Sequence, residues 1–246
     1  MRKIHLDKID THPGTESITK KEAADSKKSL KKKLSELQNR LYAQRRYKVL
    51  IILQGMDTSG KDSTVKHVFS GVNPSGCKVK SFKVPSEEEA AHHFLWRISK
   101  ECPEKGFIQI FNRSHYEDIL VPVINKQLTV KQKEQRYADI NAFESALAAD
   151  ETIIFKFYLH VSQEEQFKRL EERKQNVRKQ WKYQAEDARD IGLHDSYKKI
   201  YEDIIAHTSG IPWSIVPADI KWFKNYSILK TIVSELEKYD IEYPLK

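Results

Sequence analysis

The chain is poor in the residues that build cross-linked or membrane-embedded proteins. Its 246 residues include only two cysteines, two methionines, eight glycines and eight prolines. Two cysteines cannot form a disulfide framework or a cysteine-rich metal site, so Cys77 and Cys102 are expected to be small core residues of a protein from a reducing compartment. The longest apolar run, residues 49–53, is too short to cross a bilayer, and the polar N-terminus shows no signal peptide. A cytoplasmic location is therefore expected.

Negative charge is in deficit. The chain carries 43 Lys and Arg against 35 Asp and Glu, a formal net charge of +8. This surplus favours polyanionic partners such as nucleic acid, an anionic membrane or a phosphate-rich small molecule, although a basic surface that serves only solubility has the same net charge. With 39% hydrophobic residues, a chain of this length can form one large domain with a buried core.

Short β-rich runs alternate with helical segments. The patterns predict strands at 49–53, 78–82, 107–111, 152–159 and 214–216, and helices at 86–100, 131–149 and 163–174. Ser86 and Ser162 occupy N-cap positions, and Ser162 with Glu165 has the spacing of a capping box. Strands that alternate with helices predict an α/β fold in which helices cover both faces of a parallel sheet.

The first 45 residues contain two different kinds of sequence. Residues 1–20 are expected to be an irregular arm in front of a single domain that spans 21–246. A lysine-rich stretch follows, with leucines at helical spacing: Leu30, Leu34, Leu37 and Leu41. This spacing predicts a basic helix whose leucines pack on the body of the protein, and an arm that binds a polyanion is the alternative.

A glycine-rich turn follows the first predicted strand and opens a helix. It reads Gly55-Met56-Asp57-Thr58-Ser59-Gly60-Lys61-Asp62, the G-x-x-x-x-G-K frame of a phosphate-binding loop. In such a loop the backbone N–H groups turn toward phosphate oxygens, the helix N-terminus adds its positive end, and the lysine neutralises the transferred group. A turn that needs glycine only for its geometry is the alternative interpretation.

Two carboxylates distinguish this loop from the common pattern. Asp62 stands where a hydroxyl usually binds Mg²⁺, and Ser63 or Thr64 would partly replace that hydroxyl. Asp57 would repel phosphate unless a metal ion lies between them or the carboxylate orients an attacking phosphate oxygen. Asp57 is therefore a candidate metal ligand, and a side chain that stabilises the turn is the alternative.

The strand predicted at 107–111 runs into Asn112-Arg113-Ser114-His115-Tyr116-Glu117-Asp118. Asn112 replaces the Asp that often holds Mg²⁺ at this point of P-loop enzymes, and carboxylates reappear at Glu117 and Asp118. Asp118 is the second candidate metal ligand, whereas Glu117 is either a site residue or the capping-box partner of Ser114. Arg113 is placed to reach transferring phosphates, and His115 is expected to be structural.

A charge-dense segment, residues 174–195, precedes the last predicted strand and is expected to form a lid. Cations and one tryptophan cluster around its start: Arg173, Lys174, Arg178, Lys179, Trp181 and Lys182. Guanidinium groups suit phosphate oxygens, and an indole can stack on a base. Flanking acidic residues make a solvated charged loop the alternative, but the phosphate-binding loop in the same chain favours a lid.

Four segments, GMDTSGKDST, FNRSHYEDIL, RKQNVRKQWK and HTSGIPWSIVPADIKW, together resemble the second family of polyphosphate kinases. The resemblance covers about residues 34–230 and implies a P-loop kinase-like fold with a charged lid. It also implies phosphoryl transfer between inorganic polyphosphate and nucleotides with Mg²⁺, for which Mn²⁺ can substitute. The segment FNRSHYED is similar to the subgroup that acts on both AMP and ADP.

The resemblance also assigns residues by motif position. It implies catalytic roles for Asp57, Lys61, Arg113 and Arg173. Nucleotide or polyphosphate binding is expected from the other motif residues, namely Gly55, Met56, Thr58, Ser59, Gly60, Asp62, Ser63, Thr64, Asn112, Glu117, Lys174, Arg178, Lys179, Trp181 and Lys182. Expected partners are polyphosphate, adenine nucleotides with guanine nucleotides as an extension, and further copies of the chain, but neither membrane nor nucleic acid.

Two other functions are consistent with the same residues. An ATP-dependent nucleotide or small-metabolite kinase would share the phosphate loop and lid but would need no polyphosphate channel. A non-catalytic regulator that binds nucleotide or RNA is favoured by the basic charge and by Trp181. Turnover of AMP with polyphosphate and without ATP separates the first function from both alternatives.

Overall fold

The structure, a computed structural model, describes residues 3–14, 18–181, 183, 189 and 191–245. Within these ranges, five parallel strands form one sheet in the order β2-β3-β1-β4-β5. The strands are β1 (Lys48–Gln54), β2 (Cys77–Ser81), β3 (Ile108–Asn112), β4 (Thr152–His160) and β5 (Trp213–Pro217). Each overlaps one of the predicted runs, so the predicted α/β fold with a parallel sheet is confirmed.

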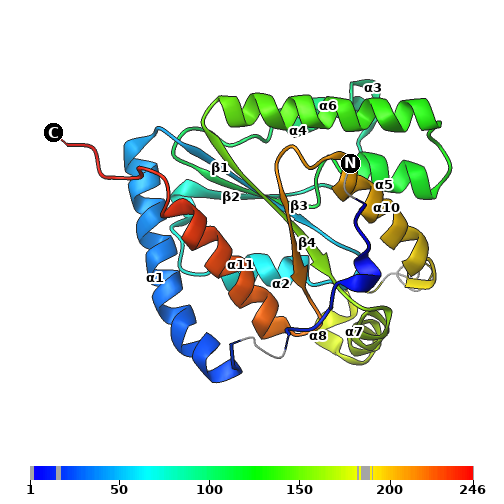
Figure 1. The fold of residues 1–246 in the computed structure, drawn as a ribbon, viewed down its shortest axis with the longest axis horizontal. Helices are drawn as coiled ribbons and strands as arrows, with labels where there is room; N and C mark the ends of the chain where they lie inside the picture. Colours follow the sequence, from blue (N-terminus) through cyan, green and yellow to red (C-terminus); the bar gives the residue numbers. More distant parts are fainter. Residues whose placement is uncertain (1–2, 15–17, 182, 184–188, 190, 246) are drawn as a thin grey trace.

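Helices cover both faces of this sheet (Figure 1). One face carries α1 (Lys20–Gln44), α2 (Lys61–Val68) and α11 (Lys221–Leu236), and the other carries α5 (Glu117–Ile124), α6 (Val130–Ala149) and α10 (His194–His207). The shorter or peripheral elements are η1 (Leu6–Lys8), η2 (Pro74–Gly76), α3 (Glu87–Ala91), α4 (Trp96–Ser99), α7 (Gln163–Gln175) and α8 (Val177–Gln180). Because all strands are parallel, the loops that follow β1, β3 and β4 lie together at the carboxyl ends of the strands.

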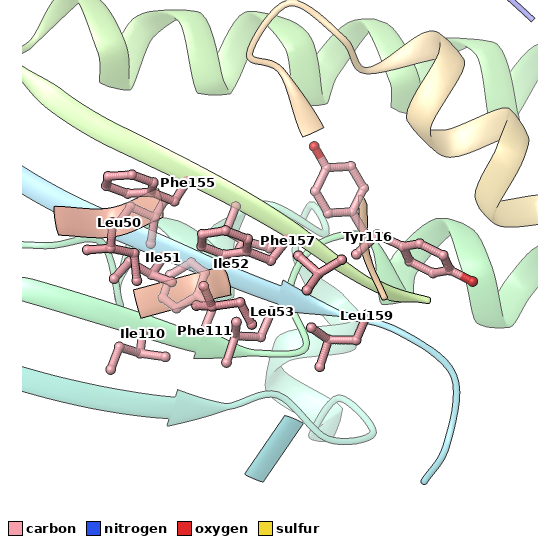
Figure 2. Close-up of a cluster of buried hydrophobic side chains, with 14 of the residues drawn as sticks. Leu50, Ile51, Ile52, Leu53, Ile110, Phe111, Tyr116, Phe155, Phe157 and Leu159 are labelled. Atoms are coloured by element: carbon pink, nitrogen blue, oxygen red, sulfur yellow. The ribbon is translucent and has the colours of Figure 1, made fainter. Parts of the chain in front are cut away.

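The core is built around β1. This strand pairs with β3 on one side and β4 on the other, and every residue in it is buried. Figure 2 shows its apolar side chains packed among those of the two neighbouring strands, including Ile110, Phe111, Phe155, Phe157 and Leu159. A parallel strand that is covered on both faces needs apolar residues at every position, which explains the unbroken run at 49–53.

The leucine-rich helix α1 packs along α11 on one face of the sheet. Leu34, Leu37 and Leu41 are buried, whereas Lys32 and Lys33, which precede them, are exposed. Thr19 and Glu22 form a capping box at the start of the helix. The interpretation of this segment as a helix whose leucines pack on the body is confirmed.

The prediction of a single helix over residues 86–100 is wrong. Ser86 caps α3 as expected, but the chain leaves the helical conformation at His92 and begins α4 at Trp96. The reason lies in packing, because α3 buries none of its side chains whereas Leu95 and Ile98 are buried. The chain therefore changes direction between the two short helices to bury the apolar residues.

The Ser162 cap is confirmed, but only half of the predicted capping box forms. Ser162 Oγ accepts from the Glu165 backbone N–H at 3.1 Å. The Glu165 carboxylate accepts from Arg169 Nε at 2.8 Å instead of reaching back to the cap. Asp219 Oδ1 replaces the Glu165 carboxylate at the cap and accepts from the Ser162 backbone N–H at 2.9 Å.

The first described segment contacts the body of the protein. Leu6, in the first described segment, is fully buried, and His160 Nε2 donates to the carbonyls of Leu6 (3.1 Å) and Ile9 (3.0 Å).

Cys77 and Cys102 are half-buried free thiols, and burial raises the pKa of each to about 11. No helix in the described ranges combines the length and apolar character needed to cross a membrane.

Candidate active site

The glycine-rich loop lies at the carboxyl end of β1 and runs straight into α2, the context that a phosphate-binding loop requires. Its backbone has positive φ values at Gly55 (151°), Thr58 (59°) and Gly60 (94°). At Gly55, an added Cβ would lie 2.9 Å from the carbonyl oxygen of Leu159 on β4. The first loop glycine is therefore needed for close packing against the sheet, and the second for backbone conformation.

Lys61 lies folded over this loop and is buried. Its Nζ donates to the carbonyl oxygens of Gly55 at 2.5 Å and Met56 at 3.2 Å. Burial, and then the nearby Arg113 guanidinium, lower the pKa of Lys61 to about 8. The ammonium is thus held at the mouth of the loop in an environment that penalises an uncompensated charge, and an anion there would stabilise it.

Asp57 is the carboxylate on which the positive charges converge. Arg113 Nη2 donates to Asp57 Oδ1 at 2.8 Å, from a left-handed backbone conformation (φ 65°) at the end of β3. Burial acts to raise the pKa of Asp57, but Lys61, Arg113 and Arg173 together outweigh it and hold the pKa below its usual value. Three of the predicted catalytic side chains therefore surround the fourth, which stays ionised.

A cavity of about 110 Å³ opens beside this group. It is lined by Gly55, Met56, Asp57, Arg113, Glu117, Leu120, Val121, Gln166, Tyr197 and Tyr201. The residues come from the phosphate loop, the end of β3, and helices α5, α7 and α10. The cavity therefore has a charged wall at the loop and a wall of aliphatic and tyrosine side chains opposite.

Glu117 is a residue of this cavity, and the alternative that it completes a capping box with Ser114 is wrong. The N-cap of α5 is Tyr116, whose backbone N–H lies 3.4 Å from Ser114 Oγ. Burial raises the pKa of Glu117, while Arg113 and Lys61 act in the opposite direction.

Asp118 is held in a different place. Its Oδ2 accepts from Arg97 Nη2 of α4 at 3.0 Å, and Arg136 donates to its backbone carbonyl. Burial raises the pKa of Asp118, and Arg97 opposes that shift. The structure does not bring together the two expected metal ligands, Asp57 and Asp118. The carboxylate that reaches the cavity is that of Glu117, the residue before Asp118 in the sequence.

The polar residues next to the loop bind one another. Asn112 Nδ2 donates to Asp62 Oδ1 at 2.7 Å, which links the end of β3 to the start of α2. Thr64 Oγ1 donates to the Gly60 carbonyl at 3.1 Å, and Ser63 Oγ lies 3.3 Å from His67 Nδ1. The residues that depart from the common P-loop pattern, an aspartate and an asparagine, thus form a pair of their own.

The predicted lid residues divide into two groups. Arg173, near the end of α7, acts on the Asp57 carboxylate. By contrast, Lys174 pairs with Glu171 at 2.7 Å and Lys179 with Glu172 at 3.2 Å. Arg178 in α8 and Trp181 at its end are exposed, and Trp181 Nε1 donates to the Arg178 carbonyl at 3.1 Å. Lys182 lies outside the described residues.

The carboxylates suit a divalent ion that shares its ligands with a substrate. Among the residues that the structure describes, no three His, Cys, Asp or Glu side chains gather into a metal-binding cluster. Asp57 and Glu117, however, line the same cavity. One or two carboxylates together with substrate phosphates and water are the usual ligands of Mg²⁺, so this donor set fits such an ion.

Two buried cations that the sequence analysis did not single out contact the phosphate loop from behind. Arg169 Nη1 donates to the carbonyls of Thr58 (3.0 Å) and Ser59 (3.2 Å). Lys224 Nζ donates to the carbonyls of Ser59 (3.2 Å) and Gly60 (2.9 Å). The sequence did contain a signal for Lys224, because this lysine lies four residues before the buried Ile228 and hence on the apolar face of α11.

His115 is structural, as expected. It is fully buried, and its Nε2 lies 3.2 Å from Glu144 Oε1. The same glutamate accepts from Tyr116 Oη at 2.6 Å and from Lys156 Nζ at 2.7 Å. This buried network joins α6 to β4 and to the chain that precedes α5.

A phosphate loop at the central strand, an arginine from the neighbouring strand end and a further arginine from the helix after β4 define the class of a P-loop kinase. Within that class, the family model described as Polyphosphate kinase 2 (PPK2) matches residues 17–244, and the chain belongs to this family. Kinases of the family are nucleotide phosphotransferases that generally need a divalent metal ion.

Individual relatives cover nearly the whole chain. It is 43% identical over 227 residues to the AMP/ADP-polyphosphate phosphotransferase of Meiothermus ruber, covering 92% of this chain and 85% of that one. Identity to the ADP-polyphosphate phosphotransferase of Rhodopseudomonas palustris is 41% over 226 residues, covering 86% and 78%. The crystal structure of polyphosphate kinase 2 from Arthrobacter aurescens matches with a TM-score of 0.95 at 34% identity, covering 99% of this chain and 88% of that chain.

Proposed function

We propose that this enzyme transfers the terminal phosphoryl group of inorganic polyphosphate to AMP and to ADP, and that the reaction runs in both directions. The observation that carries the proposal is that Lys61, Arg113 and Arg173 act together on the half-buried Asp57 and keep it ionised. Such a site suits the highly charged group in transfer between two phosphates. The substrates follow from the named relatives, one of which acts on AMP and ADP.

The transfer needs no protein nucleophile. A phosphate oxygen of the nucleotide attacks the terminal phosphorus of the chain in line, and the bond to the next bridging oxygen breaks. The phosphate loop and Lys61 bind the transferring group, Arg113 neutralises its oxygens, and Arg173 approaches from the side of α7. The thiols of Cys77 and Cys102, with pKa values of about 11, are not suited to act as nucleophiles. Catalysis is therefore positioning and charge stabilisation.

We assign metal binding to Asp57 and Glu117, and not to Asp118, whose carboxylate is occupied by Arg97. Mg²⁺ is the proposed ion, with Mn²⁺ as a substitute, and when bound it would supply positive charge that neutralises the phosphates. Asp57 and Glu117 would hold the ion, and Arg113, which donates to Asp57 at 2.8 Å, lies beside the same cavity and can also contact phosphate oxygens. The proposal includes guanine nucleotides as secondary acceptors, a lid over residues 174–195, and self-association of the chain.

The test is an incubation of the enzyme with AMP, Mg²⁺ and long-chain polyphosphate in the complete absence of ATP. Ion-exchange chromatography should show ADP first and ATP later, and Lys61→Ala should produce neither. If product forms only after ATP is added, the enzyme is an ATP-dependent kinase. Nucleotide binding without turnover under any of these conditions would leave the non-catalytic regulator as the correct reading.

A further inference from the structure

We propose that Lys224 is a positioning residue for phosphoryl transfer, which orients the N–H groups of Gly60 and Lys61 toward the phosphate chain without touching it. The inference rests on the proposed function in one respect, that phosphate binds in this loop. It assigns a role to α11, a helix that contributes no residue to the cavity lining.

The geometry of the peptide group determines where these N–H groups point. In a trans peptide the carbonyl and the following N–H point in opposite directions. Lys224 Nζ holds the carbonyls of Ser59 and Gly60, at 3.2 and 2.9 Å, on the inner side of the loop. The N–H groups of the same two peptides, which belong to Gly60 and Lys61, must then point outward. These are the groups that a phosphate-binding loop uses at the start of its helix.

The loop backbone needs to be held. Thr58 adopts a left-handed φ of 59°, which is strained for a residue with a side chain, and the φ of 94° at Gly60 is open only to glycine. A strained backbone persists only where surrounding contacts fix it. Arg169 fixes the Thr58 and Ser59 carbonyls, and Lys224 continues the series to Gly60. The approach is close, because a Cβ on Gly60 would lie 2.3 Å from Lys224 Nζ.

The surroundings of Lys224 are unfavourable for a charged side chain. It is fully buried, and the charged groups that act on it are Arg169 of α7, Lys221 of its own helix and Lys61 of α2, all of them cations. Burial and these cations lower its pKa to about 7. An apolar side chain of the same length would avoid this penalty. A residue that lowers stability at such a position is typical of functional sites, where stability is exchanged for activity.

The experiment replaces Lys224 by Met, which keeps the length and removes the charge and the hydrogen bonds. Lys224→Gln keeps a neutral donor, and Lys230→Met makes the same change as the first variant at an exposed position of α11. For each protein we would measure Tm and, by calorimetry, the Kd for inorganic tripolyphosphate and for ADP, followed by kcat and KM with polyphosphate.

The expected result is a separation of stability from binding. Lys224→Met should have a Tm equal to or above that of the wild type, while its Kd for tripolyphosphate rises about ten-fold, the size of one hydrogen bond to a charged group. The Kd of Lys224→Gln should lie between those of the wild type and Lys224→Met, and the Kd of Lys230→Met should match that of the wild type.

Two outcomes would overturn the proposal. The first is wild-type affinity and kcat/KM in Lys224→Met. The second is a loss of folding, or a large fall in Tm, in both Lys224 variants, because the lysine would then serve the fold. A wild type that binds ADP but not tripolyphosphate contradicts the proposed function instead, and the role of Lys224 is then decided by the ADP affinities of the same proteins.

Discussion

At the residue scale, the candidate site depends on how one carboxylate is surrounded. Asp57 would be protonated more readily by burial alone, but Lys61, Arg113 and Arg173 keep it ionised. The same arrangement keeps three cations close together without phosphate bound. A phosphoryl group in transfer carries negative charge on three equatorial oxygens and can contact all three cations at once, so the site is complementary to the reacting group.

Arg173 is the residue whose substitution separates catalysis from binding. We expect Arg173→Lys to lower kcat by about 10³, the lower end of what arginines contribute in phosphoryl transfer, because lysine lacks the planar fork. Nucleotide Kd should change by less than about three-fold, since a ground-state contact is a smaller effect. Steady-state kinetics and calorimetry on one preparation measure both. A raised KM with unchanged kcat would show instead that Arg173 is a binding residue.

Lys61 predicts a pH dependence of activity. Its pKa of about 8 in the free enzyme means that kcat/KM for polyphosphate should fall as the pH rises through about 8, because the ammonium is lost. Stability should change in the opposite direction. Between about 8 and 10.5 the unfolded chain still binds this proton while the folded chain has released it, so the contribution of Lys61 to the free energy of unfolding rises with pH.

The control for this pH profile is Lys61→Ala. Its residual kcat/KM, lower by orders of magnitude, should lack the fall near pH 8. A wild-type profile that stays flat from pH 7 to 9.5 would contradict the role of the ammonium.

At the element scale, single helices place several functional side chains at once. Gln166, Arg169 and Arg173 recur at intervals of three and four along α7, so one face of the helix is directed at the phosphate loop. Gln166 Nε2 donates to the Asp57 carbonyl at 2.8 Å, and Arg169 holds the next carbonyls along. The Ser162 cap and Asp219 fix the start of this helix, and thereby the position of Arg173 relative to Asp57.

The first turn of α5 offers a matched pair of substitutions. Glu117→Gln should raise the Mg²⁺ concentration needed for half-maximal activity several-fold, because it removes one of the two carboxylates at the cavity. Asp118→Asn should leave that concentration unchanged and lower the free energy of unfolding by about 1–3 kcal/mol, because it weakens the buried pair with Arg97. Mg²⁺ titrations and urea unfolding of both variants test this. The reverse pattern would return the metal to Asp118.

The sequence predicts those elements whose signal is local. An unbroken apolar run identifies β1, and the loop motif after it identifies Lys61 and the start of α2. Helix α11 was not predicted, and the position of Lys224 on its apolar face was missed with it. The roles of Lys224 and Arg169 depend on contacts with residues more than 100 positions away, which no local pattern contains. Likewise, Glu117 and Asp118 are adjacent in sequence, and only the packing of α4 and α5 separates their roles.

At the scale of the whole molecule, the basic charge has a measurable consequence. With a net charge of +8, the enzyme should bind a long polyanion largely through counterion release. The KM for long-chain polyphosphate should therefore rise steeply between about 50 and 200 mM salt, and the KM for AMP should rise much less. Tripolyphosphate, with few charges, serves as the control donor and should show a shallow slope. Equal slopes for the long and short donors would argue against an extended basic track.

The measurement that tests the central claim most directly is a ³¹P NMR time course with ADP and polyphosphate as the only phosphorylated reactants. Direct transfer predicts that one phosphate residue of the chain disappears for each ATP formed, with no accumulation of orthophosphate, and that Lys61→Ala shows neither change. ADP alone should give no ATP, which excludes disproportionation of the nucleotide. Release of orthophosphate in place of ATP, or ATP formation that does not depend on polyphosphate, would contradict the account.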